Sequence, residues 1–388
     1  MKRLLLFLFQ LAICLSLTAQ SIQDLSFGTE ATLDIMTWNI EQFPKNGETT
    51  LTNVKAIIEG LDVDIVAVQE VADINAFNQM VNGMSSYEGY LESSYFAGLA
   101  YIYKPSTIQI NALYEIYTTS EYWSYFPRSP MVMDLTFKGE RFIVINNHFK
   151  CCGDGILDLN DPNDEETRRL IASNYLKTYI DTNFSNLNVI VLGDLNDSLT
   201  DDSQNNVFQN ILDDTANYAF ADLDIANGPD TDWSYPTWPS HLDHILITDD
   251  LFPEFENSNS EILTLKIDEY LPGGWMEYDT NITDHRPVAL KLVTEGSLSV
   301  SDITSIKPGF VNYPNPFTSE TQFNLSPTSA AFTIDIYDMK GQKIQTLNGK
   351  EGQTLIDWNT ELLPNGIYMA QLLYNATIMS TRKLVKMN

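Results

Sequence analysis

The sequence predicts a layered α/β domain, with sheets inside and helices outside, followed by a small all-β sandwich domain. Strand-like and helix-like segments alternate over residues 30–295, and only short strands separated by turn residues follow a linker-like stretch at 294–309. The charge changes at the same place. Residues 20–295 carry 13 Lys and Arg against 45 Asp and Glu, a balance of −32, whereas residues 296–388 carry 7 of each.

Hydrophobic periodicity predicts the elements of both parts. Apolar residues recur at helical spacing in residues 49–61 and 163–181. The apolar faces of these helices consist of Val54, Ile57, Ile58 and Leu61 in the first and Leu170, Tyr175, Leu176 and Tyr179 in the second. Apolar, β-branched runs predict strands. In chain order these are 31–40, 63–71, 98–105, 107–117, a hairpin at 131–149 that turns at Lys138–Gly139, 188–197, 242–248 and 286–293, and in the second part 321–326, 332–347, 354–359, 366–374 and 376–387.

The first 19 residues are typical of a secretory signal peptide. Lys2 and Arg3 precede an apolar run that ends at Leu17, and small residues follow near Ala19, where we expect cleavage. A membrane anchor is the alternative, although the run is short for a spanning helix. Because no later stretch is long and apolar enough to cross a bilayer, we expect an exported monomer without a stable membrane span.

Cys151 and Cys152 are the cysteines that remain after the signal peptide is removed, and they are adjacent. Two cysteines cannot form a disulfide framework. A bond between neighbours would strain the peptide but would stiffen this loop in an oxidising compartment. Free thiols are the other interpretation, and the sequence leaves both open.

The acidic balance of the first part excludes binding of a polyanion through bulk charge. If this part acts on phosphates, metal ions and a few well-placed cations must supply the attraction. Much of the excess acid lies in residues 158–166 and 194–204. These stretches are typical of a solvated surface, with weak calcium sites as the alternative.

Polar residues that could take part in catalysis or bind a ligand lie at the ends of the predicted strands. They are Asn39, Glu70, His148, Asp194, Asn196, Asp243, Asp284 and His285. Because open α/β sheets bind ligands at strand ends, we expect these residues to converge on one pocket. Each alone has a structural alternative as a turn former or a buried histidine. Together they supply two histidines, acids able to hold a hard cation, an amide pair and an acid able to orient a histidine.

The same residues stand in six motifs that follow one another along the chain: "TWNIEQF", "VQEV", "NNHF", "GDLND", "LDHILI" and "TDHRPV". In content and order these motifs resemble those of the endonuclease/exonuclease/phosphatase superfamily, and "GDLND" and "TDHRPV" are the most specific of them. The resemblance implies a four-layer α/β sandwich with two packed mixed β-sheets. It also implies hydrolysis of phosphate esters by water.

The resemblance further implies a metal site and contacts to substrate. Glu70 is the first choice for a direct metal ligand, with Asp284 as a second and Asn39 near the same ion. Such oxygen ligands favour Mg²⁺, with Mn²⁺ or Ca²⁺ as alternatives, over zinc. Arg128 is expected to contact substrate phosphate, for which a guanidinium is suited, and Lys150 is a second candidate. A surface arginine is the alternative interpretation of Arg128.

The remaining residues would carry the proton chemistry that the resemblance implies. Asp194 would orient or deprotonate the attacking water, and Asn196 would hold the water or a phosphate oxygen. His148 and His285 would flank the phosphate as donors, and either could move a proton. Asp243 would hold the imidazole of His285 in its working tautomer.

Two of the four histidines lie in "PSHLDHILI", residues 239–247. In a strand, His241 and Asp243 would share a face and His244 would point the other way. We therefore expect His244, at a position where the family often has Tyr, to be a packing residue, and His241 to be able to touch substrate. A zinc site that combines both histidines with the two cysteines is the alternative.

The end of the chain has segments such as "YPNPFTSETQFNL" and "NGIYMAQL" that resemble the C-terminal sorting domain of the Bacteroidetes type IX secretion system. The resemblance implies that the type IX machinery is a partner and that the protein is secreted or held at the cell surface. A carbohydrate-binding or adhesive β-module is the alternative. The predicted organisation is a signal peptide at 1–19, a catalytic domain at 20–295, a linker at 296–310 and a sorting domain at 311–388.

These observations predict a secreted, divalent-metal-dependent phosphodiesterase, with an extracellular nuclease as the first choice. The alternative is the same chemistry on a lipid or small-molecule phosphoester, such as sphingomyelin or an inositol phosphate. The acidic charge weakens the nuclease choice, because nucleic-acid binding normally uses a basic surface. A catalytically dead surface-binding protein is a third possibility, against which the intact motif set counts.

Overall fold

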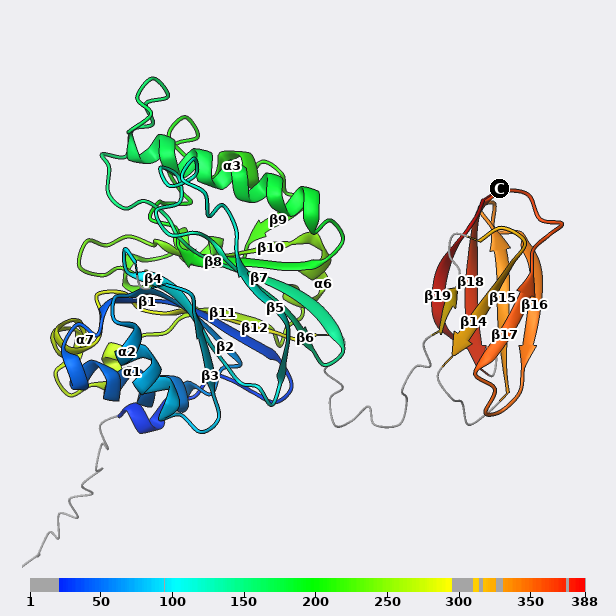
Figure 1. The fold of residues 1–388 in the computed structure, drawn as a ribbon, viewed down its shortest axis with the longest axis horizontal. Helices are drawn as coiled ribbons and strands as arrows, with labels where there is room; N and C mark the ends of the chain where they lie inside the picture. The colour runs from blue at the N-terminus through cyan, green and yellow to red at the C-terminus, as the bar shows by residue number, and fades with distance from the viewer. Residues whose placement is uncertain are drawn as a thin grey trace, which may run out of the picture. The chain divides into compact units, whose positions relative to one another are not determined.

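The computed structural model describes residues 21–93, 95–294, 310–313, 317–325, 331–374 and 377–387. The predicted signal peptide and almost all of the predicted linker lie outside the described residues. The chain divides into two compact units, with the boundary after Ser297 (Figure 1). In the described part of the chain, none of the helices has the length and apolar character needed to cross a membrane.

Two six-stranded sheets form the centre of the first unit. The first sheet consists, from edge to edge, of β11 (Glu261–Thr264), β12 (Val288–Leu292), β1 (Leu33–Phe43), β2 (Ile65–Val71), β4 (Gly98–Tyr103) and β3 (Glu88–Leu91). The second consists of β5 (Ile108–Glu115), β6 (Met131–Phe137), β7 (Glu140–His148), β8 (Asn188–Asp194), β10 (Asp243–Thr248) and β9 (Tyr218–Phe220). Both are mixed, because β1 and β2 run parallel, as do β7 and β8, while the other neighbours run antiparallel.

Helices cover the outer faces of the two sheets (Figure 1). The helices over the first sheet are α1 (Gly47–Leu61), α2 (Ile74–Asn82) and α7 (Gly274–Asn281), and α3 (Glu165–Asn183) covers the second sheet. Three helices of four residues each occur in connections: α4 (Gln209–Leu212), α5 (Leu223–Ala226) and α6 (Phe252–Phe255). One apolar cluster fills each of the three layer boundaries. The predicted four-layer α/β sandwich is therefore confirmed.

Strand alternation assigns side chains to these clusters. Along β1, Met36 and Trp38 pack toward the helices, whereas Leu33 and Ile35 pack toward the second sheet. Both faces of the strand are buried, as expected for a sheet covered on both sides. The apolar face predicted for residues 49–61 is also correct, because its four members are buried in α1.

The buried side of α3 differs from the predicted apolar face. Leu176 is buried as expected, but Leu170, Tyr175 and Tyr179 are only partly buried. Arg169 lies on the buried side instead, where it pairs with two carboxylates. Apolar periodicity did not reveal this face, because a charged side chain with buried partners occupies the place where the pattern requires an apolar one.

The strand order brings the polar strand ends together. His148 at the end of β7 and Asp243 at the start of β10 are both in register with Asp194 at the end of β8. In the first sheet, β12 runs antiparallel to β1, and its first residue, Val288, pairs with Thr37, two residues before Asn39. A buried amide contact joins the sheets nearby, where Gln69 donates to Asn146 Oδ1 at 2.8 Å.

The second unit is a small all-β sandwich, as predicted. One sheet consists of β13 (Phe310–Tyr313), β14 (Glu320–Leu325) and β17 (Leu355–Asn359). The other consists of β16 (Lys343–Gly349), β15 (Phe332–Asp338), β18 (Gly366–Tyr374) and β19 (Thr377–Lys386). The two sheets share one apolar cluster, in which the stacked rings of Phe323 and Trp358 lie 6.0 Å apart.

Gly193 controls the close approach of β8 to β7. Its φ is +147°, and a Cβ there would lie 1.9 Å from the backbone oxygen of Asn147. Gly193→Ala should therefore lower the free energy of unfolding by about 3–5 kcal/mol, because both backbone strain and overpacking result. The control is Gly139→Ala, with a φ of +87° and open space around it. Gly139→Ala should lower the free energy of unfolding by only about 1–2 kcal/mol. Urea unfolding measures both, and equal losses would contradict the steric explanation.

Candidate active site

Asp194 lies at the centre of the predicted residues and is only 2% exposed. Its Oδ2 accepts a hydrogen bond from Asn39 Nδ2 at 2.9 Å and lies 3.5 Å from His148 Nε2 and 3.9 Å from His285 Nε2. Its Oδ1 accepts the backbone N–H of Asn196 at 3.1 Å. One carboxylate therefore contacts residues from both sheets.

Asn39 also connects this carboxylate to Glu70. The amide Nδ2 of Asn39 donates to Glu70 Oε1 at 3.2 Å, while its Oδ1 accepts the backbone N–H of Glu41 at 3.0 Å. The other oxygen of Glu70 accepts both the backbone and side-chain N–H groups of Gln42, at 3.0 and 2.8 Å. In this arrangement Asn39 is a bridge between two carboxylates, and its place near an ion stays a prediction.

The backbone around Glu70 is strained. Glu41, Gln42 and Glu70 have φ values of +31°, +46° and +66°, which residues other than glycine rarely adopt. Such conformations persist only where the surrounding structure holds them, and they concentrate at functional sites. Here the strain directs the Glu70 carboxylate and the Gln42 side chain toward each other.

His285 is held in a cationic form. Its Nδ1 lies 2.7 Å from Asp243 Oδ2, and its Nε2 lies 3.9 Å from Asp284 Oδ1. Burial lowers the pKa of His285, but the carboxylates of Asp243 and Asp194 outweigh it and raise the pKa to about 10. The ring of Tyr235 covers the imidazole, with the ring centres 4.8 Å apart.

His148 has the opposite charge preference. Burial, followed by the positive charges of Arg128 and His285, places the pKa of His148 well below its usual value. Its Nδ1 is buried without a hydrogen-bond partner. Asp194 therefore lies between a neutral and a cationic imidazole. When environments separate pKa values in this way, the groups can take different roles in acid–base chemistry.

The acidic residues fit a hard divalent cation. Burial is the main cause that raises the pKa of Asp194 to about 7 and that of Asp284 to about 6. Asp194 and Asp243 each offer a carboxylate oxygen within 4.8 Å of the other. These carboxylates, with Glu70 nearby, provide oxygen donors and too little positive charge to balance them. A divalent cation would relieve this imbalance.

Glu41 and Lys45 belong to the same region and were missed in the sequence. Glu41 Oε2 accepts the backbone N–H of Asp284 at 3.0 Å and pairs with Lys45, which also contacts Asp279 at 2.9 Å. Glu41 lies two residues after Asn39 in "TWNIEQF", so its place in the motif was a usable signal. Tyr235 carried no signal in the sequence, because its contact with His285 is purely tertiary.

Arg128 and Lys150 line a neighbouring cavity of about 470 Å³. Its other lining residues are Gln42, Phe96, Ala97, Pro127, Cys151 and Arg168. Arg128 donates to the backbone oxygen of Phe96 at 2.8 Å, and Lys150 donates to that of Cys151 at 2.8 Å. Because Gln42 lines this cavity and also contacts Glu70, the cavity adjoins the carboxylates. Arg168 is a third cation that the sequence did not indicate.

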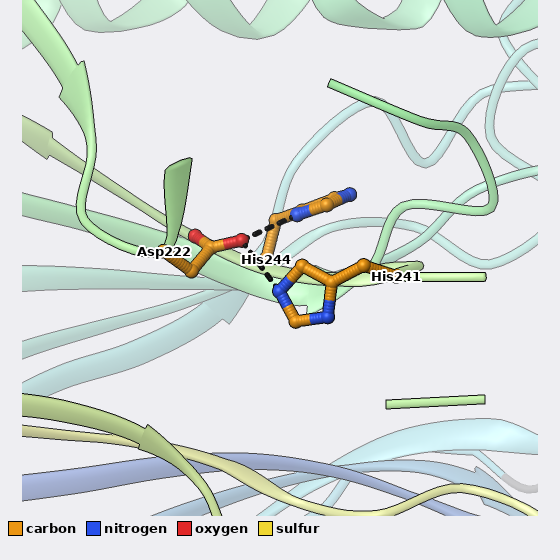
Figure 2. A group of neighbouring side chains, drawn as sticks. All are labelled: Asp222, His241 and His244. Carbon is orange, nitrogen blue, oxygen red and sulfur yellow. Dashed lines mark hydrogen bonds and ion pairs between the residues drawn. The ribbon is translucent and has the colours of Figure 1, made fainter. Parts of the chain in front are cut away.

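His241 and His244 form a separate buried cluster with Asp222 (Figure 2). Asp222 Oδ2 lies 3.0 Å from His241 Nε2 and 2.6 Å from His244 Nδ1. His241 Nδ1 accepts the backbone N–H of Ser234 at 3.3 Å, so Nε2 carries its proton. His244 Nε2 faces the backbone oxygen of Asp197 at 2.9 Å, so both of its nitrogens donate and the ring is an imidazolium.

This cluster corrects the expectation for His241. β10 begins only at Asp243, so strand alternation does not extend to His241, and both histidines turn toward one carboxylate instead of His241 facing substrate. His244 is buried and packs against Phe208 and Phe220, as expected of a packing residue, and it also pairs with Asp222. The structure does not support a zinc site that combines both histidines with the two cysteines, because neither cysteine belongs to the cluster.

The cluster should give the fold a distinct pH dependence. Burial lowers the pKa of His244, but Asp222 outweighs it, and the net shift is upward. Stabilisation from this pair is therefore complete below about pH 6.5 and is lost as the pH rises through the elevated value.

Asp222→Asn should lower the free energy of unfolding by about 3–5 kcal/mol at about pH 6, because it leaves a buried charge unpaired, and by less at about pH 9. Urea unfolding of the wild type and the variant at both pH values tests this. A difference that does not change with pH would rule out the charged pair.

Comparisons with known proteins place the chain in a family. Residues 36–285 match the Endonuclease/Exonuclease/phosphatase family, and residues 312–387 match the secretion system C-terminal sorting domain. No curated protein matches the chain.

Solved structures are similar to this chain at low sequence identity. A humanized TDP2 from D. rerio has a TM-score of 0.50 and 14% identity, over 68% of this chain and 100% of that chain. An endonuclease/exonuclease/phosphatase from Bacteroides vulgatus has a TM-score of 0.47 and 16% identity, over 68% of this chain and 99% of that chain. The human nocturnin catalytic domain with bound sulfate has a TM-score of 0.47 and 14% identity, over 68% of this chain and 95% of that chain. On the strength of the family match, which spans most of the first unit, the chain belongs to the Endonuclease/Exonuclease/phosphatase family.

Proposed function

We propose that this protein is a secreted, divalent-metal-dependent phosphodiesterase, with nucleic acid as the first choice of substrate. Family membership supports a hydrolase of phosphate esters, and the sorting domain supports export through type IX secretion to the cell surface or beyond. The observation that carries the proposal is the buried Asp194 carboxylate between a neutral His148 and a cationic His285.

Glu70 and Asp284 are the residues proposed to hold the metal ion, with Mg²⁺ as the first choice for an oxygen donor set. When bound, such an ion acts as a Lewis acid that stabilises the negative charge developing on the phosphate. Lys45 and Glu41 hold the backbone next to Asp284 in place.

Asp194 is the proposed base for the attacking water. Its pKa of about 7 allows it to accept a proton near neutral pH, and hydrogen bonds from Asn39 and Asn196 keep the carboxylate in one orientation. His285 donates a proton or a hydrogen bond to a phosphate oxygen, and Asp243 keeps its ring in place. His148, which is neutral and buried, is the second proposed donor to the phosphate, with its Nε2 3.5 Å from Asp194 Oδ2.

The cavity beside the carboxylates bears on the substrate class. Arg128, Lys150 and Arg168 gather there in a domain that is otherwise strongly acidic. Three cations beside a phosphodiesterase site favour a substrate with a second anionic group close to the reacting phosphate, as in DNA or RNA. The acidic remainder of the surface supports the alternative, a small or lipid phosphoester without a long polyanion.

Activity assays test the proposed reaction. The full chain should cleave plasmid DNA, RNA, sphingomyelin or bis-p-nitrophenyl phosphate when Mg²⁺, Mn²⁺ or Ca²⁺ is present, and EDTA should abolish cleavage. Asp194→Asn should reduce the rate about 10²–10⁴-fold, because it removes the base. The control is Asp224→Asn, which changes an exposed carboxylate and should keep the wild-type rate. If the wild type cleaves none of these substrates, or cleaves them equally in EDTA, the proposal is wrong.

The cavity cations give a test of the substrate class. Arg128→Met and Lys150→Met should each raise KM for DNA or RNA about tenfold, since each removes a charge-assisted phosphate contact. The same variants should leave KM for bis-p-nitrophenyl phosphate nearly unchanged, because that substrate has a single phosphate. Lys340→Met, an exposed lysine of the second unit, serves as a charge-matched control. Equal effects on both substrates would point to a general electrostatic role instead.

A further inference from the structure

Two exposed thiols lie side by side, and one of them, Cys151, lines the cation-lined cavity. The Sγ atoms of Cys151 and Cys152 are 2.9 Å apart, and the thiol of Cys152 donates to the sulfur of Cys151. Bonded sulfur atoms lie about 2.05 Å apart, so a short approach of the two atoms is enough to join them. We propose that Cys151 and Cys152 are a modification site at which a small-molecule disulfide forms a reversible bond between the two neighbours.

The backbone on both sides of the pair is already fixed. Arg169 Nη1 donates to the backbone oxygens of Lys150 at 2.8 Å and Cys152 at 2.7 Å. Arg169 is only 2% exposed, and carboxylates of Glu166 and Asp197 hold it at 3.0 and 2.7 Å. One buried guanidinium therefore holds the loop in place. Because the loop is already ordered, forming a bond between the two thiols loses less conformational entropy.

The next residue also keeps the loop in this position. Gly153 has a φ of +113°, and a Cβ there would lie 2.1 Å from Glu166 Oε1. Glycine therefore lets the chain lie directly against Glu166, and Cys152 before it has a φ of +73°. The close position of the two sulfur atoms is thus a property of the clamped loop.

The reaction is an ordinary thiol–disulfide exchange with oxidised glutathione as the oxidant. The thiolate of Cys151 attacks one glutathione sulfur, which breaks the glutathione disulfide and releases one glutathione thiolate. The thiolate of Cys152 then attacks the Cys151 sulfur and releases the second. Two S–H bonds of the protein are lost and one S–S bond forms, while both electrons and both protons end on two molecules of reduced glutathione.

The hydrogen bonds support Cys151 as the first nucleophile. Its sulfur accepts from Cys152 and lies 3.7 Å from Lys150 Nζ. The hydrogen bond to Cys151 is the main cause that raises the pKa of Cys152. Cys152 is accordingly the resolving thiol.

The bond should be easily reduced. Neighbouring Cα atoms lie about 3.8 Å apart across a trans peptide, whereas disulfides usually join Cα atoms about 4.4–6.8 Å apart. A strained, exposed disulfide has a more oxidising potential and belongs to the labile class rather than the structural one. The sorting domain indicates export, and disulfides persist outside the cytosol.

Oxidation should also affect the cavity, an effect that rests on the proposed function. Cys151 lines the cavity with Arg128 and Lys150, and Lys150 contacts both the sulfur and the backbone oxygen of Cys151. Joining Cys151 to Cys152 converts the thiol that Lys150 contacts into a disulfide sulfur. The position of a phosphate-binding cation therefore depends on the state of the pair.

Intact-mass measurement tests the bond itself. The purified protein without its predicted signal peptide, and so without Cys14, is treated with oxidised glutathione, blocked with N-ethylmaleimide and weighed. We expect the wild type to lose two hydrogen atoms and take up no label, and to take up two labels after dithiothreitol. Cys151→Ser and Cys152→Ser should instead each keep one glutathione, because no resolving thiol remains. A lasting glutathione adduct on the wild type, a covalent dimer, or two labels without reduction would overturn the proposal.

KM measurements on the same samples separate this inference from the proposed function. Oxidised wild type should differ severalfold in KM for DNA or RNA from the reduced form, and the difference should disappear on reduction. The Cys151→Ser/Cys152→Ser double variant should show no response to oxidised glutathione. If the bond forms but KM does not change, the link to the cavity is wrong. If no substrate is cleaved in either state, the proposed function fails while the mass result still decides the bond.

Discussion

One side-chain amide joins the two halves of the candidate active site. Asn39 Nδ2 donates to Glu70 in the first sheet and to Asp194 in the second, so two carboxylates from different sheets meet at a single neutral donor. Without this bridge, the buried Asp194 would lose a hydrogen bond, and the negative charges would repel each other with little water to screen them. The buried hydrogen bond from Gln69 to Asn146 is a second contact between the two sheets near the same place.

The charge states of the two histidines beside Asp194 follow from the neighbours that the strands give them. Asp243 lies in register with Asp194 and also contacts His285, so this histidine faces two carboxylates and is cationic. His148, on the other neighbouring strand, is buried near positive charge and is neutral. Two residues of the same type thus acquire different chemistry because the strands place them beside different neighbours.

The loop after Asp194 is held from two sides. The Asp197 carboxylate accepts from Arg169 of α3, and the Asp197 backbone oxygen accepts from His244, which is itself paired with Asp222. Arg169 also holds the backbone around Cys151. The dithiol loop, the long helix and the loop that carries Asn196 are therefore joined by one buried polar network.

The sequence by itself determined the layered fold, the terminal sandwich and the strand-end residues, because periodicity and motif order depend on local spacing. It also indicated the contact between Asp243 and His285. The tertiary structure alone decided the buried face of α3, the histidine pair on Asp222, the cation-lined cavity and the Tyr235 contact. The physical reason is that each of these depends on a charged, polar or aromatic side chain finding a partner distant in the sequence, and neither apolar periodicity nor strand alternation contains the position of that partner.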